Sequence, residues 1–64
     1  MNKANYTGEN AEIVTLEMAS QITSLGISTI RQKGKECGAL LKIGRAIRVD
    51  LPKLLDYLRT FTIN

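Results

Sequence analysis

Hydrophobic residues in the first half of the chain recur at helical spacing. Four apolar side chains fall at i, i+1, i+4 and i+7, on one side of an α-helix: Met18, Ala19, Ile22 and Leu25. Thr15 precedes this stripe as an N-cap, and Glu17 stands in the first turn, where a carboxylate favours the positive end of the helix dipole. The pattern predicts a first helix over roughly residues 15–24.

A second helix is expected after a very short turn. Gly26 is predicted to end the first helix, because glycine enters the left-handed conformation without steric cost. Ser28 is predicted to cap the next helix, over residues 28–37, through its hydroxyl. Ile30 lies on the inner face of this helix together with Gly34, which indicates close packing against the first helix or an early fray.

After residue 38 the period changes from helical to alternating, which predicts a β-hairpin. Four apolar residues can all face inward: Leu41, Ile43, Ile47 and Val49. This requires a three-residue loop, Gly44-Arg45-Ala46, that pairs residues 43 with 47, 42 with 48 and 41 with 49. A two-residue loop of Gly44 and Arg45 would instead place Lys42 on the same face as the inner residues, so the three-residue loop is favoured.

The favoured register has an electrostatic consequence. It places Lys42 opposite Arg48 on the outer face of the hairpin, with Arg45 at the tip. Like charges directly opposite one another destabilise a hairpin. An anionic partner would therefore relieve a cost that the fold otherwise bears.

A third helix begins at Asp50, which is expected to cap it, with Pro52 in the first turn. Its apolar stripe consists of Leu51, Leu54, Leu55 and Leu58. This stripe is expected to pack over the first helix and the hairpin, burying Leu54 and Leu55. Tyr57 and Phe61 either complete the core or leave an exposed apolar edge, and the first alternative is favoured.

Length and composition limit what such a chain can be. With 64 residues, 44% of them hydrophobic and only three aromatic, one small aliphatic core is expected. We interpret residues 1–12 as a flexible N-terminal arm, 13–61 as the domain and 62–64 as a frayed C-terminus. No apolar run approaches the length of a membrane helix. The sole cysteine, Cys37, has no partner for an internal disulfide and is expected to be a small buried hydrophobe, which fits a cytoplasmic protein.

The same composition argues against an enzyme. The sequence has no histidine and one cysteine, too few soft ligands for a zinc site, and the commonest general base is missing. Its serines have no paired base, and Ser28 is explained as a cap. We expect a protein without catalytic residues, metal or cofactor.

Positive charge is concentrated in one block of the chain. Between residues 31 and 48 there are six basic residues and one acidic residue, Glu36, so this block has a net charge of +5, whereas the whole chain has +3. The basic residues are Arg31, Lys33, Lys35, Lys42, Arg45 and Arg48. Such a patch is typical of a protein that binds a polyanion. The alternative is a solvated face that only keeps the protein soluble.

The predicted elements combine into one architecture. Helix, tight turn, basic helix, basic-tipped hairpin and covering helix make a small α+β winged helix-turn-helix, in the order helix-helix-strand-strand-helix. The second helix would then read the major groove of double-stranded DNA, and the hairpin would be the wing. The candidate contacts on the helix are Ser28, Thr29, Arg31, Gln32 and Lys35, and those on the wing are Lys42, Gly44, Arg45 and Arg48.

Over about residues 13 to 60 the sequence resembles the small winged-helix excisionases of transposons and phages, also called recombination directionality factors, which are related to MerR-type DNA-binding domains. The residues that carry the resemblance are Thr15 to Ser20, Gly26, Ile30-Arg31, Ile43 to Val49 and Leu51 to Leu58. The resemblance implies an accessory factor that binds repeated sites, bends DNA, can self-associate on it, and helps a tyrosine recombinase (integrase) excise a mobile element.

Two other functions stay open at this point. The first is a protein-interaction module, in which the leucine helix and Phe61 dock on a partner and the basic block provides solubility. The second is a transcriptional regulator of mobile-element genes. Binding to duplex DNA that weakens steeply with salt would separate the DNA-binding functions from the first of these.

Overall fold

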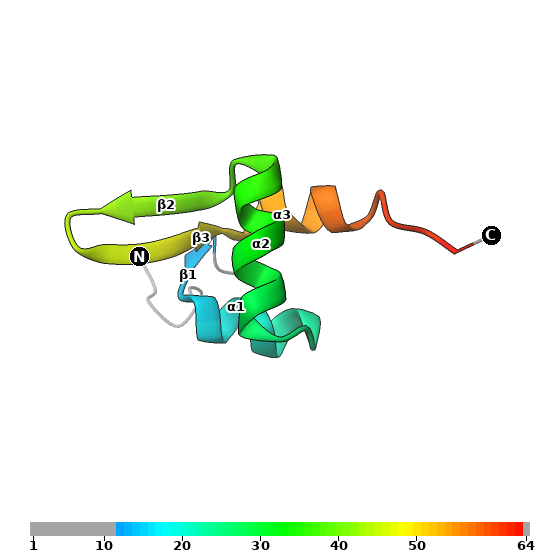
Figure 1. The fold of residues 1–64 in the computed structure, drawn as a ribbon, viewed down its shortest axis with the longest axis horizontal. Coiled ribbons are helices and arrows are strands. Elements are labelled where there is room, and N and C mark those ends of the chain that lie inside the picture. Colours follow the sequence, from blue (N-terminus) through cyan, green and yellow to red (C-terminus); the bar gives the residue numbers. More distant parts are fainter. Residues whose placement is uncertain (1–11, 64) are drawn as a thin grey trace, which may run out of the picture.

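The computed structural model describes residues 12–63, which form three helices and a three-stranded sheet (Figure 1). In chain order the elements are β1 (Ile13–Val14), α1 (Leu16–Thr23), α2 (Ile27–Cys37), β2 (Leu40–Ile43), β3 (Ala46–Asp50) and α3 (Leu51–Leu58). The expected α+β class is confirmed, with the three helices and the hairpin in the predicted order. The short strand β1 was not predicted, and the predicted arm of residues 1–12 lies, apart from Glu12, outside the described residues.

The three strands form an antiparallel sheet in the order β1-β3-β2. Strand β1 pairs with the end of β3 through Val14 and Val49, and the main-chain N–H of Leu51 donates to the carbonyl of Glu12 at 2.7 Å. The chain segment before α1 is thereby fixed to the start of α3. This pairing needs only two residues, too few for an alternating pattern to be visible in the sequence.

The predicted register of the hairpin is wrong by one residue. Ile43 pairs with Ala46, and Lys42 pairs with Ile47, so the loop consists of Gly44 and Arg45 alone. Gly44 has a φ of 62°, and Arg45 is not among the residues with positive φ, which is the pattern of a type II′ turn with glycine first. This turn matches the twist of the strands, and that preference outweighs the alternation of apolar residues.

The shift in register also changes which hairpin residues face the core. Val49 is fully buried, but Ile43 and Ile47 are 58% and 37% exposed, contrary to the expectation that all would face inward. The hairpin projects away from the helices (Figure 1), so residues near its tip have no core to enter. Lys42 and Arg48, predicted to lie opposite one another, leave opposite faces of the sheet.

The ends of the first two helices differ in detail from the prediction. The N-cap of α1 is confirmed, since Thr15 Oγ1 accepts the N–H of Met18 at 3.0 Å. The left-handed residue that ends α1 is Ser24, with a φ of 63°, rather than Gly26. Gly26 is instead the extended N-cap of α2, so Ser28 lies inside the helix and is not its cap.

Hydroxyl groups explain how a serine occupies the left-handed position between α1 and α2. Thr23 Oγ1 donates to the carbonyl of Ala19 at 2.8 Å and accepts the N–H of Leu25 at 3.2 Å. Ser20 Oγ donates to the carbonyl of Leu25. These bonds close the turn from both sides and compensate for the steric cost of a positive φ at Ser24.

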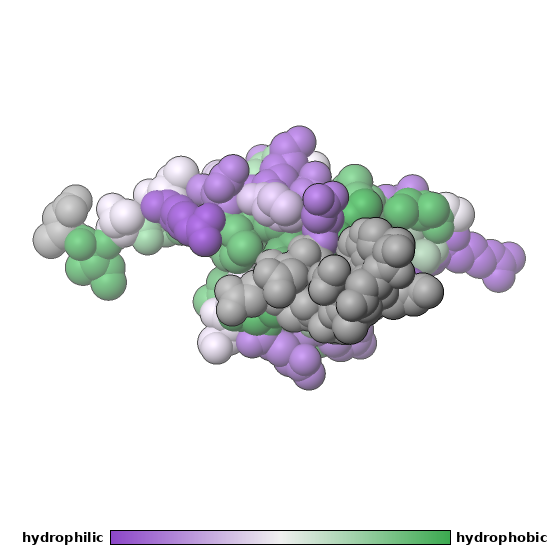
Figure 2. Space-filling view, turned by 180° about the vertical axis from the view of Figure 1, so that it is seen from behind, coloured by the Kyte–Doolittle hydropathy of each residue, from purple (hydrophilic) through white to green (hydrophobic). Residues whose placement is uncertain are grey.

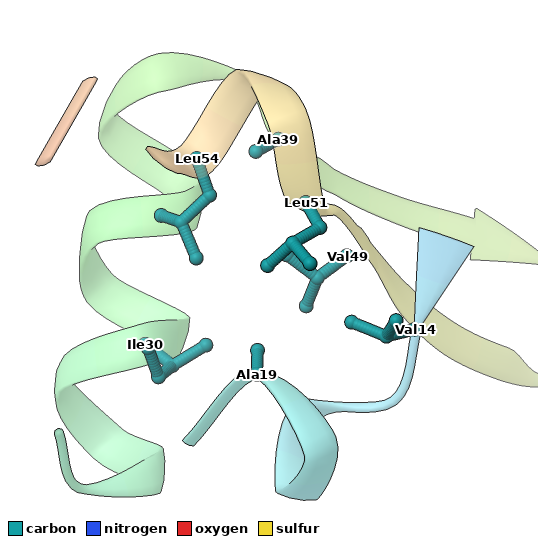
Figure 3. Packing of buried hydrophobic residues seen from close by; sticks show 7 residues of the cluster. All are labelled: Val14, Ala19, Ile30, Ala39, Val49, Leu51 and Leu54. Atoms are coloured by element: carbon teal, nitrogen blue, oxygen red, sulfur yellow. The ribbon is translucent and has the colours of Figure 1, made fainter. Parts of the chain in front are cut away.

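The core is small and aliphatic, as expected, and every helix and both β1 and β3 contribute buried side chains to it (Figure 3), while Leu40 of β2 packs against it. The buried side chains are Val14, Ala19, Ile30, Ala39, Val49, Leu51 and Leu54. The predicted stripe of α1 is confirmed, because Met18, Ile22 and Leu25 pack against this cluster around Ala19. Cys37, expected to be buried, is only partly buried at its edge.

Helix α3 covers the core as predicted, with one difference between its leucines. Asp50 caps it by accepting the N–H of Lys53 at 3.3 Å. Leu54 is fully buried, whereas Leu55 is only partly buried. Phe61 is 55% exposed and Tyr57 half-buried, so these aromatic side chains do not complete the core. None of the helices formed by residues 12–63 is both long and apolar enough to span a membrane.

Candidate nucleic-acid interface

One flank of α2 is polar, exposed and basic. Ser28, Arg31 and Lys35 follow one another at i, i+3 and i+7, and Gln32 lies beside them at i+4. All four side chains are exposed. The other side of the helix packs against the rest of the domain, where Ile30 and Gly34 are buried. We call these four residues the basic flank of α2.

Thr29 belongs to the other flank. It is partly buried, and it is spaced at i, i+4 and i+7 with Lys33 and Glu36. Of the five helix residues predicted as DNA contacts, four therefore share one flank, and Thr29 lies on the side that faces α3.

The flank that faces α3 is tied down by a cluster of polar and aromatic contacts. The Tyr57 hydroxyl donates to Glu36 Oε1 at 2.6 Å, and Lys33 Nζ lies 3.4 Å from the same oxygen. Lys33 Nζ also lies 4.8 Å from the ring centroid of Phe61, which stands edge-on to the Tyr57 ring at a centroid distance of 5.2 Å. We call these four residues the α3 latch.

The contacts of the latch shift two pKa values in opposite directions. The hydrogen bond from Tyr57 holds the pKa of Glu36 below its ordinary value, with Lys33 acting in the same direction and burial against it. The same hydrogen bond raises the pKa of Tyr57, because removing its proton would bring a second negative charge beside the carboxylate. Glu36, the only acidic residue of the basic block, thus stays ionised and is paired with Lys33.

Sequence reasoning missed the α3 latch. Tyr57 and Glu36 are 21 residues apart in the chain, and no spacing rule connects them. The only signal was the alternative not favoured for Tyr57 and Phe61, an exposed apolar edge, and in the structure these side chains contact Lys33 and Glu36.

The hairpin packs against α2 on the side of the basic flank. A Cβ atom on Gly34 would lie 2.9 Å from Cγ and Cδ2 of Leu40, so the glycine allows β2 to approach the helix closely. The close contact predicted for Gly34 is therefore made with β2 rather than with α1. Gly34 is next to Lys35 and one turn after Arg31, which places β2 beside those two cations.

The hairpin carries two of its cations toward this side of the molecule. The side chain of Lys42 projects from the same sheet face as that of Leu40. Lys42 is two residues closer to the tip of the hairpin, about 6.6 Å along the strand. It is exposed, as are Gly44 and Arg45 at the tip. Arg48 is partly buried and leaves the other face, where its Nη1 donates to the carbonyl of Ile47 at 2.9 Å.

The cations on this side form no ion pair with the acidic residues that the structure describes. Within residues 12–63, the ion pairs closer than 4.0 Å are Lys33–Glu36 and Arg59–Asp56. Arg31, Lys35, Lys42 and Arg45 take part in neither. Their positive charge is available to an anion outside the domain.

The elements and their order define a small α+β domain with a winged-helix-like arrangement, in which α2 and the hairpin β2–β3 are adjacent. Residues 12–61 match a family model described as "Family of unknown function (DUF6462)". Because this match covers more than half of the 64 residues, the chain belongs to that family. Neither the curated proteins nor the solved structures contain a significant match.

Proposed function

We propose that this protein binds double-stranded DNA, with α2 in the major groove and the tip of the hairpin on the neighbouring backbone. The observation that carries the proposal is that cations from two separate elements, which form no ion pair within residues 12–63, gather on one side of the fold. Arg31 and Lys35 come from α2, and Lys42 and Arg45 come from the hairpin. A partner that neutralises all four must present several negative charges over a long surface, as a phosphate backbone does.

The residue types on the basic flank suit the major groove. The groove is about 12 Å wide and admits an α-helix. A guanidinium such as that of Arg31 can donate two hydrogen bonds to one guanine, and the amide of Gln32 can pair with adenine. Ser28 and Lys35, at the two ends of the flank along the helix axis, would donate to phosphates, which fix the position of a helix without reading sequence.

The tip of the hairpin would extend the contact to the adjacent backbone. From Leu40, which packs on α2, to the tip at Gly44 the strand covers four residues, about 13 Å. Arg45 would then bridge phosphates or enter the minor groove beside them. Arg48 is left out of this surface, because the register sends its side chain to the opposite face of the sheet.

The biological role we propose is that of an excisionase-like accessory factor, which would bind DNA beside a tyrosine recombinase during excision of a mobile element. The support is the resemblance of residues 13 to 60 to the winged-helix excisionases, together with the small α+β arrangement. No step of this role needs a catalytic group, metal or cofactor from this chain.

A charge-matched pair of variants tests the proposed DNA binding. Affinity for a fluorescent duplex is measured at several salt concentrations for the parent, for Lys35→Ala and for Lys33→Ala. Both variants remove one positive charge from α2. Lys35 belongs to the basic flank, whereas Lys33 belongs to the α3 latch on the other side of the helix. Lys35→Ala should flatten the slope of log affinity against log salt by about 0.9, the value for one lost phosphate contact.

The control variant, Lys33→Ala, should keep the parent slope. Absence of salt-dependent duplex binding by the parent chain would refute the proposal. Equal flattening by the two variants would show that net charge, rather than the basic flank, determines the affinity.

A further inference from the structure

The sheet face turned away from α2 is apolar and spans all three strands. Positions 46, 48 and 50 of β3 alternate onto this face, and their partners across the sheet are Ile43, Leu41 and Ile13. Ile13 and Ile43 are 54% and 58% exposed. Seen from behind, the protruding hairpin carries hydrophobic surface next to its hydrophilic tip (Figure 2). We call Ile13, Leu41, Ile43, Ala46 and Arg48 the outer sheet face.

One positive charge lies in the middle of this apolar surface. Arg48 is directly opposite Leu41 and two residues from Ala46 on its own strand. Within residues 12–63 no carboxylate lies within 4.0 Å of its guanidinium. The acidic residue of β3 on the same face, Asp50, already accepts the N–H of Lys53 as the cap of α3. Arg48 therefore retains donors for a carboxylate from outside the domain.

The strand at the border of this face has a free edge. In the order β1-β3-β2, strand β2 has a neighbour on one side only within the described part of the chain. An extended peptide can add a strand to such an edge, and its alternate side chains then lie over one face of the sheet. A strand added beside β2 would lie two strand spacings, about 9.6 Å, from β3. A glutamate and an arginine side chain together bridge that distance over Leu41.

We propose that the outer sheet face binds an extended segment of a partner protein that combines apolar residues with a carboxylate. The apolar residues would cover Ile43 and Leu41, and the carboxylate would pair with Arg48. Charge complementarity favours this occupant over two others. A second copy bound through the same face would bring two Arg48 guanidinium groups together, and DNA gains nothing from Ile13 and Ile43. This inference is independent of the proposed DNA binding, which uses the opposite side of the hairpin.

A selection from a displayed library of random peptides tests the inference on the full chain. Peptides that bind the parent protein should be enriched in aspartate or glutamate flanked by apolar residues. Arg48→Glu should weaken the enriched peptides about tenfold or more, and selection on this variant should enrich lysine or arginine at the former acidic position. Lys42→Glu makes the same charge change on the opposite face of the hairpin and should leave peptide binding unchanged.

A second variant guards against misfolding of Arg48→Glu. Ile43→Asp replaces an exposed residue next to the turn, so it should keep the parent melting temperature and still abolish binding of the selected peptides. Four results would overturn the inference: no enriched peptides, enriched peptides without acidic residues, binding that survives both variants, or dimerisation of the parent chain through this face. Duplex DNA that competes with the peptides for Arg48 would overturn it as well.

Discussion

The two flanks of α2 carry similar side chains but place them in different surroundings. Toward α3, Lys33 and Glu36 pair with one another, and the carboxylate accepts a hydrogen bond from Tyr57 at 2.6 Å. Toward the hairpin, Arg31 and Lys35 are exposed, and neither takes part in an ion pair within residues 12–63. A single helix thus has one flank occupied by contacts inside the domain and another that is open.

The difference shows how a small domain can hold an exposed helix in place. A core of seven buried hydrophobic residues fixes only one side of α2. The α3 latch adds contacts on a second side, and Gln32 of the basic flank also helps to lower the pKa of Glu36 in this latch. The rotation of α2 about its axis, and with it the direction in which Arg31 points, depends on both.

The largest expected effect comes from loosening the occupied flank. Leu54→Ala removes a fully buried side chain that anchors α3, and should lower the free energy of unfolding by about 2–5 kcal/mol. Leu55→Ala, at the partly buried neighbouring position, should cost less. Chemical denaturation of both variants checks this order. Equal stability of the parent and Leu54→Ala would mean that α3 does not hold α2.

The next effect concerns the open flank. Arg31→Ala should lower the affinity for a duplex that carries the preferred site by about 1–3 kcal/mol, if the guanidinium makes two bonds to one guanine. The loss should be confined to one base position in a set of duplexes with single base-pair changes. A uniform loss on specific and random duplexes would identify Arg31 as a phosphate contact instead.

A smaller effect is expected at the tip of the hairpin. Arg45 is exposed in a two-residue turn and has no buried partner, so Arg45→Ala should change stability by less than about 0.5 kcal/mol. Its effect should appear in the salt dependence of duplex binding, with a slope flattened by about 0.9. A variant with the parent affinity and slope would show that the hairpin stands clear of DNA, leaving α2 as the only contact.

The smallest effect is a change in titration at the α3 latch. Tyr57→Phe removes the hydrogen bond that lowers the pKa of Glu36, so this pKa should rise toward its ordinary value. In the parent, a lowered pKa stabilises the fold above the pKa of the unfolded chain, and this contribution disappears as the pH falls through the folded-state pKa. The variant should therefore lose less stability on acidification. A carboxyl NMR titration and pH-dependent unfolding measure both quantities.

The helices could be predicted from the sequence because their signals are local and their faces are buried. Thr15 caps α1 as expected, and the stripe around Ala19 packs on the core. The ends were less predictable. Ser24 rather than Gly26 takes the left-handed conformation, because hydroxyl bonds from Thr23 and Ser20 favour the turn there, and such bonds depend on the final geometry.

The hairpin register could not be deduced from hydrophobic alternation. That pattern assumes that every apolar residue of a strand is buried, and Ile43 lies at the end of a hairpin that extends beyond the core. The preference of Gly44-Arg45 for a type II′ turn was the stronger signal. For the candidate site, helical spacing alone was enough to place the predicted residues of α2, except Thr29, on one flank of the helix. The separation of Lys42 from Arg48 required the true register.

The most direct test of the proposed DNA-binding surface is a titration of the isotope-labelled chain with duplex DNA, followed through its backbone and side-chain NMR signals. The largest shifts should fall on Ser28, Arg31, Gln32 and Lys35 and on the hairpin from Lys42 to Arg45. The signals of Tyr57 and Phe61 in the α3 latch should change little, as should those of Ile13 on the outer sheet face. Shifts centred on the latch or on the outer sheet face, with the basic flank unchanged, would contradict the proposed orientation of α2 and the hairpin on DNA.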